Sequence, residues 1–283
     1  MSGFSASWLA LREPVDHRSR NVSLRSRLAS ELAKRVPRDQ VLQVTDLGCG
    51  TGSNLRALAP GLHQRQSWRM VDYDSALLAE ARSQLMAWAD RSEASQEKIV
   101  LHKDGCDITV VFEQRDLNLQ LEDVLGLPAD LVTAAAFFDL VSEPWIDRFC
   151  RTLNTMFYTV LTYDGHEQWL PEHSADVSMR EAFHALQSTD KGFGVAAGPR
   201  ATDVMSNCLV KAEFRVERAP SPWLLSQQGD QALMSALAQG SASAVSETGR
   251  VSAADIKSWL LARQQAQSCV VGHEDLLAIP PDR

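Results

Sequence analysis

Apolar residues recur along this chain in two ways: short runs rich in β-branched and aliphatic residues, and longer runs with helical spacing or strong helix formers. The run VLQVTDL at 41–47 is too short for a confident helix and favours a strand. Similar runs end near Asp72, near Asp116 and at 141 and 164. The stretches between them predict helices at 53–60, 75–91, 121–125 and 143–154.

This alternation of strand and helix predicts an α/β fold: a mostly parallel sheet with helices on both faces, joined by right-handed crossovers. An Asp104-Gly105 pair between two β-rich runs also predicts a hairpin, whose second arm becomes the third core strand.

The two ends of the chain depart from the alternation. A helix is predicted at 22–36, ahead of the first strand, and residues 1–40 are interpreted as a helical cap or lid. Residues 41–283 form one elaborated domain with insertions at about 165–200 and 228–267. The second half is predicted to contain a helix near 174–188, a sixth strand within 212–225 broken by prolines, helices at 230–247 and 253–267, and a last strand at 268–280.

The charge distribution limits the partners of this protein. A net charge of −8 argues against a nucleic-acid surface, because such binding depends on Lys and Arg. Residues 1–40 nevertheless carry eight basic and four acidic side chains, so this segment is about +4 and the remainder about −12. Either these charges cover a solvated helix face, or they belong to a lid whose arginines meet an anionic ligand.

The cysteines and the hydropathy pattern predict a cytoplasmic protein without a metal site. The five cysteines show no CxxC and no Cys/His spacing suited to zinc, which favours reduced, mostly buried thiols. No apolar run approaches the ~20 residues that a membrane span requires, and no charged-then-apolar leader opens the chain.

Three glycines follow the first predicted strand, in the sequence G-C-G-T-G. In open α/β sheets the ligand lies outside the carboxyl ends of the strands, so Gly48, Gly50 and Gly52 are placed to touch it. Glycine tolerates positive φ in such a turn and lets a ligand approach the main chain. The spacing matches neither GxGxxG nor the Walker loop GxxxxGK[ST].

Three carboxylates narrow the class of ligand. Asp46 precedes the glycine loop, Asp72 closes the second strand where a carboxylate can accept both hydroxyls of a ribose, and Asp116 ends the third strand where it can accept an adenine amino hydrogen. With no anion-binding group in these motifs, the pattern predicts a nucleoside without phosphate that carries a cationic amino acid.

In these features the sequence resembles the class I S-adenosylmethionine-dependent methyltransferases. The resemblance rests on VTDLGCGTGSN, WRMVDYDSALLAEAR, FEQRDL, DLVTAAAFFDLV and VVGHEDLLAIP, within 41–164 and 212–280. It implies a seven-stranded sheet whose last strand is antiparallel and lies between the fifth and sixth. It also implies S-adenosylmethionine as cofactor and S-adenosylhomocysteine as product. The implied cofactor residues are Asp46, Gly48, Gly50 and Gly52 for the methionine, Asp72 for the ribose, and Tyr73, Asp116, Leu117, Ala135 and Ala136 around the adenine and the floor.

The acceptor side is less clearly marked. Asp139 and His166 are selected as catalytic candidates because each follows a strand whose end should face the methyl group. Other polar candidates are Glu143, Tyr163, Asp164, His173 and Lys191. The aromatic residues Trp8, Trp145, Trp169, Phe183, Phe193 and Trp223 either form an acceptor pocket or pack in the core.

The sequence therefore predicts methyl transfer to an N or O atom, or to carbon, of a small-molecule acceptor by in-line displacement. A nucleic-acid or protein methyltransferase is the alternative among enzymes, supported by the basic amino end. A non-catalytic cofactor-binding protein is the alternative outside them. The sequence is compatible with a monomer or a homodimer.

Overall fold

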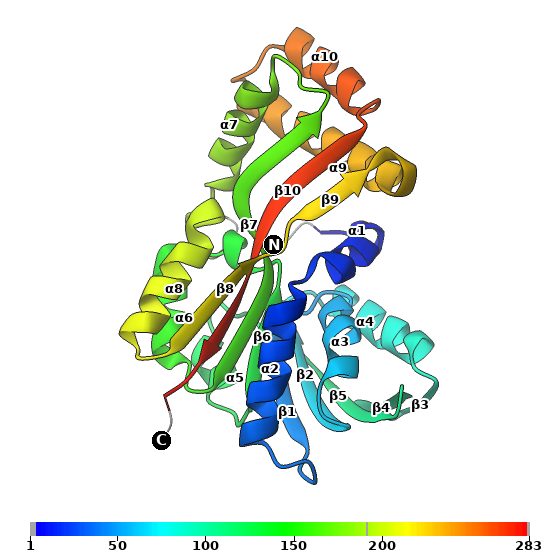
Figure 1. The fold of residues 1–283 in the computed structure, drawn as a ribbon, viewed down its shortest axis with the longest axis vertical. Coiled ribbons are helices and arrows are strands. Elements are labelled where there is room, and N and C mark those ends of the chain that lie inside the picture. The colour runs from blue at the N-terminus through cyan, green and yellow to red at the C-terminus, as the bar shows by residue number, and fades with distance from the viewer. Residues whose placement is uncertain (1–3, 191, 282–283) are drawn as a thin grey trace.

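A single mixed sheet forms the centre of the computed structural model, which describes residues 4–190 and 192–281 (Figure 1). Within these residues its strand order is β3-β4-β5-β2-β1-β6-β7-β10-β8, and β9 pairs with β10. The strands are β1 (Leu42–Leu47), β2 (Arg65–Asp72), β3 (Arg91–Ala94), β4 (Lys98–Lys103), β5 (Cys106–Gln114), β6 (Leu131–Ala135), β7 (Met156–Leu170), β8 (Arg215–Pro220), β9 (Trp223–Ser226) and β10 (Ser268–Ile279).

Seven of these strands confirm the predicted topology. The strands β5, β2, β1, β6 and β7 run parallel to one another. The last strand, β10, is antiparallel and lies between β7 and β8, the fifth and sixth strands of this core. The strand order reverses at β1, so the carboxyl end of β1 is the switch point at which a ligand is expected.

The predicted count of seven strands is too low, for local reasons. The Asp104-Gly105 hairpin forms as predicted, with positive φ at both residues, and its first arm is β4. The preceding helix α4 (Ser75–Trp88) ends earlier than predicted, and the chain then pairs with β4 as β3. The prolines in 212–225 split that run into β8 and β9, which pair with different parts of β10.

Helices cover both faces of the sheet, and each face has its own apolar core. One core joins α2 (Val22–Arg35), α3 (Ser53–Leu58) and α4 to the sheet. The other joins α5 (Leu121–Leu125), α6 (Glu143–Thr152) and α8 (Ala201–Lys211) to the opposite face. These two cores fix the strands whose carboxyl ends surround the site.

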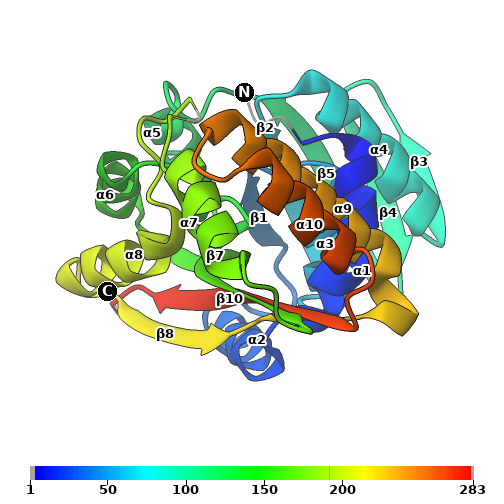
Figure 2. The same ribbon diagram turned by 90° about the horizontal axis from the view of Figure 1, so that it is seen from above.

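The long strands β7 and β10 continue beyond the other strands and carry an upper lobe. Positive φ at Leu161 and a register shift between Val271 and His273 accompany this extension. The upper arms pack with α7 (Asp176–Gln187), α9 (Gln227–Thr248) and α10 (Ala253–Arg263), which overlie the sheet in the view from above (Figure 2). The predicted end of the fifth strand at 164 is therefore wrong, because pairing with β10 carries it to Leu170.

A further helix, α1 (Ala6–Ser19), crosses the carboxyl ends of the central strands. The sequence placed it only within a helical cap or lid at 1–40 and gave no bounds for it, since Pro14 lies inside it and its apolar residues form no clear stripe. Its N-cap is Ser5, whose hydroxyl oxygen accepts a hydrogen bond from the Trp8 backbone N–H. This helix is the roof of the cavity described next.

Candidate ligand-binding site

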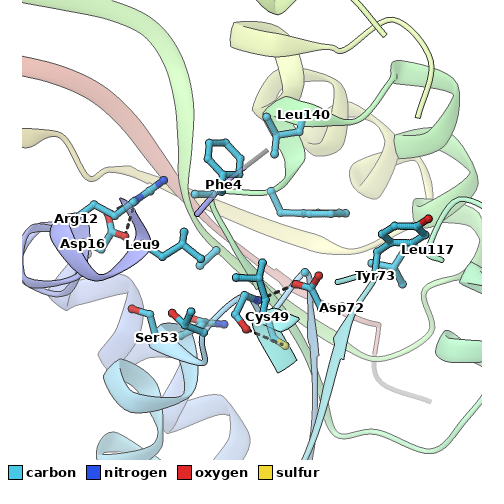
Figure 3. Close-up of a pocket in the computed structure, with 18 of the residues that line it drawn as sticks. Phe4, Leu9, Arg12, Asp16, Cys49, Ser53, Asp72, Tyr73, Leu117 and Leu140 are labelled. Carbon is cyan, nitrogen blue, oxygen red and sulfur yellow. Dashed lines mark hydrogen bonds and ion pairs between the residues drawn. The ribbon is translucent and has the colours of Figure 1, made fainter. Parts of the chain in front are cut away.

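A cavity of about 610 Å³ lies between α1 and the carboxyl ends of β1, β2, β5 and β6 (Figure 3). This volume lies within the roughly 300–1,000 Å³ that is typical of small-molecule sites. Of the predicted cofactor residues, the following line the cavity: Gly48, Gly50, Asp72, Tyr73, Asp116, Leu117, Ala135 and Ala136. The structure thus brings together side chains from four separate strand ends.

The glycine loop follows β1 in a conformation that glycine alone adopts readily. Gly48 and Gly50 have φ values of +61° and +53°, and both line the cavity. A Cβ on Gly48 would lie 2.7 Å from Cδ2 of Phe137, so the absent side chain also makes room for this ring. Gly52, with φ +82°, is the N-cap of α3 and does not line the cavity.

Asp72 is held at the end of β2 with its carboxylate at the cavity. Its Oδ2 accepts a hydrogen bond from the Gly50 backbone N–H at 2.8 Å, and Oδ1 accepts one from the Asp74 N–H at 3.0 Å. Burial raises the pKa of this carboxyl, although both backbone bonds oppose the shift. A carboxylate has about four lone-pair sites, so two remain for a ligand.

Asp46 lies outside the cavity lining and contacts it through Asn54. The Asn54 side-chain amide donates to Asp46 Oδ1 at 2.7 Å, and the Asn54 oxygen accepts from Arg20 Nη1 at 2.8 Å. Asp46 Oδ2 is buried without a hydrogen-bond partner among the described residues. Burial raises the Asp46 pKa to about 7, helped by the nearby charge of Asp72 and opposed by Asn54 and Arg20.

Three arginines line the cavity as well: Arg12, Arg20 and Arg115. The expectation of no anion-binding group in the motifs is wrong for Arg115, which stands in FEQRDL, whereas Arg12 and Arg20 come from α1 and the residue after it. A solvated helix face does not describe Arg12 and Arg20, which are buried, and a lid whose arginines meet an anionic ligand stays a prediction. The sequence did contain one signal for these arginines, the excess of basic side chains in residues 1–40, but it gave no means of choosing which of them face the cavity.

The upper wall of the cavity is apolar. It is formed by Phe4, Leu9, Phe137, Leu140 and Phe193. Figure 3 shows Phe4 and Leu140 above Cys49, on the other side of the cavity from Tyr73. This wall is the part of the cavity that offers space for a second, apolar molecule.

The aromatic prediction is only partly confirmed. Of its six residues, Phe193 lines the cavity and Trp145 supports the wall from behind, with its ring centroid 5.6 Å from that of Phe193 and 5.6 Å from that of Phe137. Trp8, Trp169, Phe183 and Trp223 are not lining residues. Phe4 and Phe137 were missed. Phe137 follows directly on the predicted Ala135 and Ala136, whereas no pattern pointed to Phe4.

The two catalytic candidates differ in position. Asp139 lies between the lining residues Phe137 and Leu140, and its Oδ1 is buried with no hydrogen-bond partner among the residues described. Burial raises the Asp139 pKa to about 6, opposed by the charge of Arg12. His166 is exposed on the upper arm of β7 and does not line the cavity.

The remaining polar candidates make other contacts. Glu143 forms an ion pair with Arg200, the Tyr163 hydroxyl lies 3.0 Å from His184 Nε2, and Asp164 Oδ1 accepts from the His166 backbone N–H. His173 lies beside the start of α7, where its Nδ1 accepts from the Ala175 N–H. Lys191 lies outside the described residues.

Polar contacts hold α1 over the glycine loop. Arg56 on α3 forms a bidentate ion pair with Glu13, at 2.7 Å and 2.5 Å, and also donates to the Thr51 carbonyl oxygen. His17 Nε2 lies 3.0 Å from the Ser53 hydroxyl oxygen. These contacts join the roof directly to α3 and to the end of the glycine loop.

Within residues 4–190 and 192–281, no cluster of three or more His, Cys, Asp or Glu side chains is arranged to hold a metal ion. In the same ranges no helix has the length and apolar character needed to cross a membrane.

No protein-family model and no curated protein sequence matches this chain. Solved structures with a similar fold match this chain, and three of them are 11–14% identical to it. A cyclopropane-fatty-acyl-phospholipid synthase-like protein from Lactobacillus casei is 11% identical, with 95% of this chain and 98% of that chain covered and a TM-score of 0.49.

An S-adenosylmethionine-dependent methyltransferase from Geobacter sulfurreducens, in complex with S-adenosyl-L-homocysteine, is 14% identical over 99% of this chain and 100% of that chain, with a TM-score of 0.44. A phosphoethanolamine N-methyltransferase from Haemonchus contortus is 12% identical, with a TM-score of 0.45. The match covers 99% of this chain, which spans only 58% of the Haemonchus chain. The fold assignment therefore rests on the strand order itself.

Proposed function

We propose that the cavity binds S-adenosylmethionine and that the protein transfers its methyl group to a small-molecule acceptor. The observation that carries this proposal is the order of groups along the sheet edge. Asp116 follows β5, Asp72 ends β2, Gly48 and Gly50 follow β1, and the wall residues Phe137 and Leu140 follow β6. Adenine, ribose, sulfonium and acceptor would occupy these positions in the same order.

The residues present fit the cofactor. Asp72 keeps two lone-pair sites for the ribose hydroxyls, and Leu117 and Tyr73 offer apolar surface for the adenine. At the other end, Arg20 suits the carboxylate of the methionine portion. The unpartnered Oδ2 of Asp46 adds negative charge near its ammonium group.

When bound, S-adenosylmethionine supplies a methyl group that is already activated by the positive sulfur. The protein then has to hold the acceptor in line, with the reacting atoms about 3–3.5 Å apart, and to exclude water. Helix α1 closes the cavity from above, and Phe137 and Leu140 form the wall beside Gly48. Asp139 is not a lining residue, but it lies in sequence between the wall residues Phe137 and Leu140, and its unpartnered Oδ1 would take a proton from an N–H or O–H acceptor.

Because three arginines line the cavity, a dinucleotide is the alternative ligand that has to be compared with S-adenosylmethionine. A pyrophosphate would be attracted by Arg20 and would lie across the glycine loop. Asp72 is expected to bind ribose in either case, so the choice depends on the loop and not on Asp72. A calorimetric comparison of S-adenosylhomocysteine with NADH separates the two.

The experiment is a titration of the purified protein with each ligand, repeated for Asp72→Ala and for the exposed control Asp39→Ala. Two charge-assisted hydrogen bonds are worth about 2–4 kcal/mol together, so Asp72→Ala should weaken S-adenosylhomocysteine at least about 30-fold. Asp39→Ala should bind like the unchanged protein. Binding of NADH alone, or equal binding by both variants, would contradict the proposal.

A further inference from the structure

The proposed function leaves the chemical class of the acceptor open. The surroundings of Arg12 indicate what charge the acceptor carries. This side chain is buried, with 9% of its surface exposed, and lines the cavity from α1. Its Nε and Nη2 donate to Asp16 at 2.8 Å and 3.2 Å, and the guanidinium stacks over the Trp223 ring at 4.9 Å from its centroid. The side chain is therefore held in one orientation.

That orientation leaves one edge of the guanidinium without a partner. Among residues 4–190 and 192–281 no hydrogen bond involves Arg12 Nη1, and this atom is not one of the fully enclosed polar atoms that lack partners. Figure 3 shows the side chain extending from α1 toward Phe4 in the apolar wall. A donor in such surroundings gains most from an ionised acceptor, whose charge-assisted bond is about twice as strong as a neutral one.

Arg12 packs on the side of the cavity away from Asp72. Its ring partner Trp223 is on β9, which pairs with β10, and in the order β2-β1-β6-β7-β10 this strand and β2, which carries Asp72, lie on opposite sides of β1. Arg20, by contrast, donates to Asn54 beside the loop and so serves the cofactor end.

Resting on the proposed function, we infer that the methyl acceptor has an apolar, ring-sized body and an anionic group, carboxylate or phosphate, that binds Nη1 of Arg12. The body packs against Phe4, Leu9, Phe137, Leu140 and Phe193. Arg12 is then a specificity-determining residue. It selects the acceptor by its charge and has no part in binding the cofactor.

The test uses four probes that share one apolar body. The protein is saturated with S-adenosylhomocysteine and titrated with 2-naphthoate, 2-naphthyl phosphate, the neutral 2-naphthamide and the cationic 2-(aminomethyl)naphthalene. We expect at least one anionic probe to bind about tenfold or more tightly than the amide, and the better anion identifies carboxylate or phosphate as the group. Equal binding of the anions and the amide, tightest binding of the amine, or no binding of any probe would overturn the inference.

Variants then assign the preference to Arg12. Because Arg12→Gln alone leaves the buried Asp16 unpaired, the informative protein is the double variant Arg12→Gln/Asp16→Asn, which removes both charges. It should bind the amide as before and lose the preference for the anion. The control is Arg18→Gln, on the same helix but ion-paired with Asp230 outside the cavity. It should keep the preference.

Binding of S-adenosylhomocysteine shows whether each variant is folded and keeps the two claims separate. If the unchanged protein fails to bind S-adenosylhomocysteine, the proposed function is wrong. If it binds S-adenosylhomocysteine and the anion preference survives in the double variant, the role of Arg12 is wrong and the proposed function stands.

Discussion

Replacing Asp46 by Asn should stabilise the free protein at high pH. Asp46 is fully buried, and burial raises its pKa from an ordinary value of 3.8 to about 7. Between these two values the folded state holds a proton that the unfolded state has released. Stability therefore falls as the pH rises through this window, and the whole penalty is present above pH 7.

The size of the effect follows from the two pKa values. One pKa unit corresponds to about 1.36 kcal/mol. The raised pKa of Asp46 therefore lowers the free energy of unfolding by about 1.6 kcal/mol at pH 5 and by about 4 kcal/mol at pH 8.5. Asparagine never ionises. Its NH2 group would take the position of Oδ2, so like the protonated carboxyl it places a donor there, where no partner is found in the described part of the chain. The stability advantage of Asp46→Asn should thus grow by about 2.5 kcal/mol from pH 5 to pH 8.5.

The assay is urea denaturation of both proteins at several pH values, with Asp39→Asn as an exposed control whose difference from the unchanged protein should stay flat. Other buried carboxyls, such as Asp72, titrate in both proteins and largely cancel in the comparison. The same substitution should weaken S-adenosylmethionine, because it removes negative charge near the ammonium group. An advantage that is constant with pH, or that shrinks toward pH 8.5, would refute the electrostatic reasoning.

Three further changes test other parts of the site. Gly48→Ala places a Cβ 2.7 Å from Phe137 at φ +61°, so it should lower the free energy of unfolding by about 2 kcal/mol. It should also weaken the binding of S-adenosylhomocysteine measured by calorimetry. Gly61→Ala, which has open space around the new Cβ, should change neither quantity. Once an acceptor is found, methyl transfer should increase as the pH rises through about 6, where Asp139 ionises, and Asp139→Asn should lose this dependence. Glu13→Gln breaks the ion pair that ties α1 to α3, so amides of 6–19 should exchange faster by mass spectrometry, up to about tenfold, while unchanged exchange would show that the pair does not hold the roof.

The part of the cavity lining that follows β1, β2 and β5 was predictable because it depends on local sequence. A strand, a glycine turn and a helix place Gly48 and Gly50 at the cavity by backbone geometry alone. Asp72 and Asp116 follow strands, and strand ends meet at one edge of a parallel sheet. Each step needed only neighbouring residues and a general rule of α/β topology.

The apolar wall and Arg12 depend on contacts between distant segments, which no local pattern records. Leu9 and Arg12 lie on α1 and Phe4 precedes it, and the ion pair of Glu13 with Arg56, 43 residues away, ties this helix to α3. The upper arm of β7 forms because β10 continues beside it, although the run 165–170 is polar. That extension keeps His166 exposed and outside the cavity lining.

The central claim is that the cavity holds S-adenosylmethionine with its ribose at Asp72, and a crystal structure of the S-adenosylhomocysteine complex tests it most directly. The account predicts both ribose hydroxyls within hydrogen-bond distance of the Asp72 carboxylate, the adenine beside Leu117 and the amino-acid end toward Arg20. A nucleoside bound elsewhere, or reversed so that the adenine lies near Arg20, would contradict the account.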